Sequence, residues 1–117
     1  HKWSRGSVTV LAGPGMPGAA RLAGAAARRA GAGHVTLAAP DAATAALLRT
    51  DPGMVVHEGA IDPLLEDPRR QAWVIGPGGG REAPKLLVQA VLQLAFTPMR
   101  LSVITLSFAC APEMRTP

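Results

Sequence analysis

The order of elements is set by residues 7–38, SVTVLAGPGMPGAARLAGAAARRAGAGHVTLA. The β-branched run 7–11 predicts a buried strand, and a loop rich in glycine and proline follows it. Alanine, the best helix former, dominates residues 19–30 and predicts a helix that stops at Gly31 and Gly33. Residues 34–38 predict a second strand. A strand, a crossover helix and another strand indicate a parallel α/β sheet.

The first predicted helix has two different faces. Arg21, Arg28 and Arg29 fall on one side of it, which we expect to face solvent. The opposite side is formed almost entirely by alanine together with Leu22. These side chains are small enough for the helix to lie close to the sheet.

The same alternation continues along the chain. Asp41 is placed to cap a helix that runs to Leu48, because aspartate is a favoured residue at a helix N-terminus. Further β-like runs occupy residues 54–57, 72–75 and 101–106, and helical patterns occupy residues 63–66 and 82–96. The sequence therefore predicts five strands in a mostly parallel sheet.

Length and composition exclude several classes of protein. A chain of 117 residues allows one domain, and a hydrophobic fraction of 48% is too high for a disordered chain. The uncharged runs 86–99 and 101–112 are shorter than the roughly 20 residues of a membrane span. The lone Cys110 and the absence of an apolar signal segment favour a cytoplasmic protein. The net charge of +4 comes from scattered arginines with few aromatic residues, so we expect no nucleic-acid partner and no membrane partner.

Two glycine-rich loops are the best candidates for a binding site. Residues 13–18 and 76–80 each follow a predicted strand and precede a predicted helix. In an open parallel sheet, ligands bind beyond the carboxyl ends of the strands. Backbone N–H groups and the positive end of a helix dipole attract phosphate there. We therefore expect both loops to lie at the same edge of the sheet.

The first loop also matches the dinucleotide fingerprint G-x-G-x-x-G. Its glycines are Gly13, Gly15 and Gly18, and Asp41 lies 23 residues after the last of them. The two prolines inside the loop remove N–H donors that a pyrophosphate needs. Asp41 has an alternative role as a helix cap. A Rossmann-type oxidoreductase fragment is thus one interpretation of this loop.

Catalytic and metal-binding groups are scarce. The three histidines, His1, His34 and His57, are far apart and lack metal-ligand spacing, so no metal site is predicted. Residues 84–112 contain no acidic side chain, which leaves the last predicted strand without a general base. We assign no catalytic residue in this chain.

Four segments resemble the ADP/ATP-dependent NAD(P)H-hydrate dehydratases. They are HKWSRG at residues 1–6, MPGAARLA at 16–23, RAGAG at 29–33 and VIGPG at 74–78. The resemblance implies a ribokinase-like, three-layer αβα sandwich. It also implies metabolite repair, in which ADP or ATP, with Mg²⁺, drives dehydration of the S form of hydrated NADH or NADPH. By this resemblance, Ala19 and Gly78 would contact the dinucleotide substrate, and Gly18 and Gly76 belong to the same binding loops. A homo-oligomer is compatible with such a family.

The later part of the chain departs from the family pattern. Family members continue with Asp-Ala-Asp-Ala, Thr-Pro-His-Pro-Gly-Glu and Lys-Gly segments, and with a Gly-Thr-Gly-Asp motif that holds the catalytic aspartate. Residues 101–106 read LSVITL where the first of these motifs should fall. We therefore expect residues 1–117 to form an incomplete domain, roughly its first half. Residues 96–117 would be a divergent tail read in a shifted frame. A truncated, non-enzymatic product with weak nucleotide binding is the remaining alternative.

Overall fold

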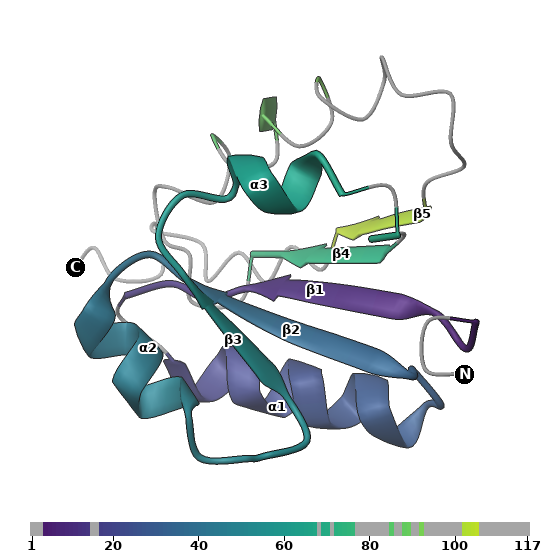
Figure 1. The fold of residues 1–117 in the computed structure, drawn as a ribbon, viewed down its shortest axis with the longest axis horizontal. Coiled ribbons are helices and arrows are strands. Elements are labelled where there is room, and N and C mark those ends of the chain that lie inside the picture. The colour runs from purple at the N-terminus through teal and green to yellow at the C-terminus, as the bar shows by residue number, and fades with distance from the viewer. Residues whose placement is uncertain are drawn as a thin grey trace, which may run out of the picture.

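The computed structural model describes residues 4–14, 17–67, 69–70, 72–76 and 102–105, together with Lys85, Val88, Gln89 and Leu92. Five parallel strands form one sheet in the order β3-β2-β1-β4-β5. This arrangement confirms the predicted parallel α/β sheet (Figure 1). The strand bounds are Ser7–Leu11 for β1, His34–Ala39 for β2, Val55–Glu58 for β3, Ala72–Ile75 for β4 and Ser102–Thr105 for β5.

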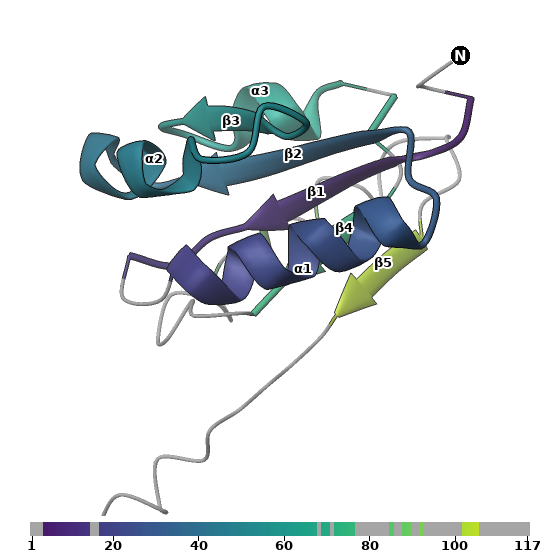
Figure 2. The ribbon, with the colours of Figure 1, turned by 90° about the horizontal axis from the view of Figure 1, so that it is seen from below.

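Helices cover both faces of the sheet. Helices α1 (Pro17–Arg29) and α2 (Ala42–Leu48) lie on one face, and α3 (Asp62–Leu65) lies on the other (Figure 1). Figure 2 shows α1 running back along the sheet, opposite in direction to β1. Three layers result, as the family resemblance implied.

Strand side chains alternate between two apolar clusters because successive residues point to opposite faces of a sheet. Val10 and Leu37 belong to the cluster beneath α1 and α2. Leu11 and Trp73 belong to the cluster beneath α3, together with Leu65 from that helix. Strands β1, β2 and β4 are therefore buried on both faces, which explains their largely apolar composition, whereas the edge strand β3 is half-exposed.

Helix α1 touches the sheet through its smallest side chains. Ala20 and Gly24 are buried, and Ala23 and Ala27 pack against the same cluster. The expectation that Leu22 would join this face is wrong, since Leu22 is 75% exposed. At 100° per residue, Leu22 lies about 200° around the helix from Ala20, on the far side from the sheet.

Local signals explain where the first two helices begin and end. The Asp41 carboxylate accepts the Thr44 N–H at 2.7 Å and so caps α2, as predicted. This bond is the main reason why the pKa of Asp41 is lowered. Gly31 has a φ of +107° just after α1, a conformation that glycine adopts without strain. The Ala32 N–H then donates to the carbonyl of Ala27 and closes the helix.

Only part of the predicted helix 82–96 can be compared with the structure. Lys85, Val88, Gln89 and Leu92 have helical backbone and are exposed. Leu86 and Leu94, which fall on one side of this predicted helix, lie outside the described residues. Within the part of the chain that is described, no helix is long and apolar enough to span a bilayer.

Candidate functional site

The carboxyl ends of the two central strands meet at one edge of the sheet. Val10 of β1 pairs in parallel with Val74 of β4, so the chain leaves both strands in the same direction. Gly76 follows β4 directly and has a φ of +130°, which favours glycine. The beginnings of both glycine-rich loops are therefore at the same edge, as expected. Gly15 and Gly78 lie outside the described residues.

This edge is also where the sheet changes its direction of winding. The chain moves from β1 to β2 and β3 on one side, and then crosses to β4 and β5 on the other side of β1. Ligands in open α/β sheets bind at such a switch point. The Rossmann fold has the same central strand order, so strand order alone does not separate the two interpretations. The Asp41 side chain, which the Rossmann interpretation requires for ribose binding, is instead bonded to the N-terminus of α2.

The N-terminus of α1 lies at the edge where β1 ends. Helix α1 begins at Pro17, whose missing N–H costs nothing at this position. Gly18 is exposed, and a Cβ built on it would meet nothing within 4 Å. Ala19 is half-buried. The first turn of this 13-residue helix is therefore uncovered by described residues at Gly18, and the first N–H groups of a helix have no partner within the helix itself.

A cavity of about 290 Å³ lies at the same edge, beyond the ends of β1 and β2 and against the loop that leads into α3. Its walls are mainly apolar, and its only charged lining side chain among the described residues is that of Asp62. The lining residues are Leu11 and Ala12 after β1, Ala38, Ala39 and Pro40 after β2, Gly59, Ala60, Ile61 and Asp62 before and in α3, and Gln89.

Two side chains from different segments form the polar side of this cavity. The Gln89 amide nitrogen donates to Asp62 Oδ1 at 3.0 Å. Asp62 is the first residue of α3, and Gln89 belongs to the helical segment after β4. The bond therefore connects two elements that are 27 residues apart in sequence. Sequence reasoning did not identify either residue.

The loop between β3 and α3 is fixed by three local features. The Gly59 N–H donates to the carbonyl of Ala39 at 3.0 Å and extends the ladder between β2 and β3. Gly59 itself has a φ of +100°. His57 Nε2 donates to the carbonyl of Ala60 at 2.8 Å. The cavity wall formed by Gly59 and Ala60 is thus held by directed bonds.

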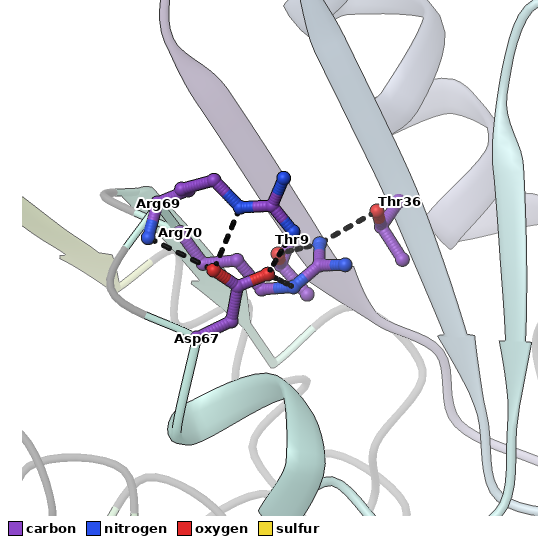
Figure 3. Close-up of polar contacts among 5 residues, drawn as sticks. All are labelled: Thr9, Thr36, Asp67, Arg69 and Arg70. Carbon is purple, nitrogen blue, oxygen red and sulfur yellow. Dashed lines mark hydrogen bonds and ion pairs between the residues drawn. The ribbon is translucent and has the colours of Figure 1, made fainter. Parts of the chain in front are cut away.

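A second polar cluster lies on the α3 face of the sheet (Figure 3). Arg70 donates to the hydroxyls of Thr36 and Thr9 at 2.7 and 3.3 Å, and both threonines are buried. Asp67 accepts hydrogen bonds from Arg69, which lower the pKa of the Asp67 carboxyl. Burial lowers the pKa of the Arg70 guanidinium. This cluster anchors the connection between α3 and β4 to the sheet.

Metal ligands do not gather anywhere in the described part of the chain. It contains no group of three or more histidine, cysteine, aspartate or glutamate side chains that could hold an ion.

Comparison with known proteins agrees with the resemblance found in the sequence. A family model described as NAD(P)H-hydrate dehydratase matches residues 8–99. The bifunctional NAD(P)H-hydrate repair enzyme Nnr of Escherichia coli (strain K12) is 39% identical over 84 residues. The match covers 70% of this chain and 16% of that enzyme. The five-stranded parallel sheet is consistent with a fragment of a ribokinase-like domain.

Proposed function

The chain belongs to the NAD(P)H-hydrate dehydratase family, and on this premise we propose that it binds a hydrated nicotinamide dinucleotide at the carboxyl edge of its sheet. The reaction that we propose for the complete enzyme is ADP- or ATP-dependent removal of water from the S form of hydrated NADH or NADPH. That reaction is metabolite repair, because it restores the reduced cofactor. We expect it to take place in the cytoplasm.

One observation carries this proposal. The N-terminus of α1, the glycine that follows β4 and the cavity beyond β1 and β2 all lie at the edge where these strands end. A dinucleotide has two phosphates flanked by two nucleosides. It therefore needs an anion site with a neighbouring cavity, which this edge offers.

Each loop has a distinct role in the proposed complex. Backbone N–H groups at Gly18 and Ala19 would donate to phosphate oxygens, and the helix dipole would favour the negative charge. Gly76 and Gly78 would let the backbone after β4 approach the ligand closely, since glycine has no Cβ to obstruct it.

The affinity of this chain alone should be low. A helix N-terminus contributes about 0.3–1 kcal/mol per anionic group, and at most about 2. Micromolar binding requires about 8 kcal/mol, whereas millimolar binding requires about 4 kcal/mol. We therefore expect a dissociation constant in the millimolar range.

The described residues do not fit a nucleoside triphosphate with its Mg²⁺. The cavity presents a carboxylate and, among the described residues, no lysine or arginine. A triphosphate needs cationic partners. We therefore assign ADP, ATP and Mg²⁺ to no residue of this part of the chain and derive no step through them. We propose that residues 1–117 act as one domain, and their sequence does not contain the Gly-Thr-Gly-Asp motif expected from the family.

An NMR titration with hydrated NADH tests the proposed site. Ala19→Asp places a carboxylate next to the anion site, and should weaken binding at least about tenfold, or about 1.4 kcal/mol. Ala26→Asp is the matched control because it adds the same charge to an exposed position near the other end of α1. Circular dichroism checks that both variants are folded. Equal binding by the two folded variants would contradict the assignment.

A further inference from the structure

The cavity beyond the ends of β1 and β2 is unlike an anion site. Its walls are formed by leucine, alanine, proline and isoleucine side chains, and one side carries the hydrogen-bonded pair Asp62 and Gln89. Such a combination of apolar walls and a few directed polar groups is typical of small-molecule sites. The part of a dinucleotide that suits it is uncharged and carries hydroxyl groups.

We propose that this cavity takes the adenosine ribose of the dinucleotide with its 2′- and 3′-hydroxyls free, and that Asp62 makes the site prefer hydrated NADH over hydrated NADPH. This inference rests on the proposed function and adds a specificity-determining residue to it. The volume of about 290 Å³ is at the small end of ligand cavities, which suits a single sugar with part of its base.

The hydrogen bonds of Asp62 leave room for such a ligand. Gln89 donates to Oδ1, and no described side chain donates to Oδ2. A carboxylate accepts up to about four hydrogen bonds and donates none, so Oδ2 is suited to ribose hydroxyls. The Gln89 bond also holds the Asp62 carboxylate in place beside the cavity that both residues line.

The 2′-phosphate of hydrated NADPH would be repelled in this cavity. It brings negative charge toward the Asp62 carboxylate, and no lysine or arginine among the described residues lines the cavity. Proteins that accept NADP usually place an arginine at this phosphate, whereas those that prefer NAD use an acidic residue on the 2′-hydroxyl. Like charges in contact oppose binding and so create specificity.

NMR titrations of the 117-residue chain with hydrated NADH and with hydrated NADPH test this inference. We expect NADPH hydrate to bind about tenfold more weakly, which corresponds to about 1.4 kcal/mol. In Asp62→Asn, which keeps the acceptor for Gln89, the difference should fall to about threefold or less. The control Asp41→Asn retains a good helix cap and lies outside the cavity, so it should keep the wild-type difference.

The possible outcomes separate the two proposals. If both dinucleotides bind and Asp62→Asn leaves their ratio unchanged, the inference is wrong and the proposed function stands. If Asp41→Asn changes the ratio instead, the ribose lies at Asp41 as in a Rossmann fold, and the inference is also wrong. If neither dinucleotide binds, the proposed function fails and the inference fails with it.

Discussion

Gly24 offers a sharp test of how α1 packs on the sheet. A Cβ at this position would lie 2.7 Å from Met54 Sδ and 2.9 Å from Leu37 Cδ2. Real Cβ atoms do not approach other atoms so closely, so Gly24→Ala forces the helix or both side chains to move. Leu37 is fully buried and Met54 is 9% exposed, so neither can turn out into solvent without loss of packing.

Two opposing effects determine how much Gly24→Ala changes the free energy of unfolding. Replacing glycine with alanine inside a helix stabilises it by about 0.8–1 kcal/mol. Inserting a methyl group into a packed core destabilises by about 1–3 kcal/mol. We expect Gly24→Ala to lower the free energy of unfolding by about 1 kcal/mol. Urea unfolding followed by circular dichroism should show this as a midpoint about 0.5 M lower.

Gly18→Ala is the matched control on the same helix. A Cβ there meets nothing within 4 Å, so this change should leave stability unchanged or raise it slightly. Met54→Ala removes one of the two clashing groups, so its cost should be smaller in the Gly24→Ala background than in the wild type. A Gly24→Ala variant that is about 1 kcal/mol more stable than wild type would refute this packing.

Three further predictions concern the polar cluster and the activity. Arg70→Met leaves the buried hydroxyls of Thr9 and Thr36 without their donor, and should cost about 2 kcal/mol in urea unfolding, whereas the exposed Arg69→Met should cost less. Because the pKa of Asp67 is lowered in the folded state, its contribution to stability is present above its unfolded value of 3.8 and is lost as the pH falls through the folded pKa. Asp67→Asn should therefore flatten the pH dependence of the urea midpoint below pH 3.8, and an unchanged slope would contradict this role. The purified chain should restore no NADH from its hydrate with ADP or ATP, as followed by NADH absorbance, and steady turnover would disprove the assignment of no catalytic residue.

The strands and helices near the N-terminus could be predicted because their signals are local. The β-branched run of β1, the alanine-rich run of α1 and the Asp41 cap of α2 each act within a few residues. Leu22 was assigned to the wrong face because the sheet selects the side of α1 with the smallest residues. The side of α1 that faces the sheet is the one that lets helix and sheet approach closely, and the positions of the arginines alone do not identify that side.

The site could be predicted only in outline. Glycine-rich loops after strands indicated the correct edge of the sheet, since parallel strands end together. Asp62 and Gln89 were not predicted because they are 27 residues apart in sequence and meet only in the folded chain, where β4 lies beside β1. Gly59 carried a usable signal, since a glycine after a short strand often marks a positive φ.

The central claim is that a hydrated dinucleotide binds at the carboxyl edge of the sheet, and backbone amide shifts measure this most directly. Titrating hydrated NADH into ¹⁵N-labelled chain should shift the amides of Ala12, Ala19 and Gly59 at this edge. The amides of Gly33 and His34 provide an internal control, because both donate to the carbonyl of Gly6 at the opposite edge. Shifts confined to Ala12, Ala19 and Gly59 would support binding at the carboxyl edge of the sheet. Shifts at Gly33 and His34, or no shifts at millimolar ligand, would contradict it.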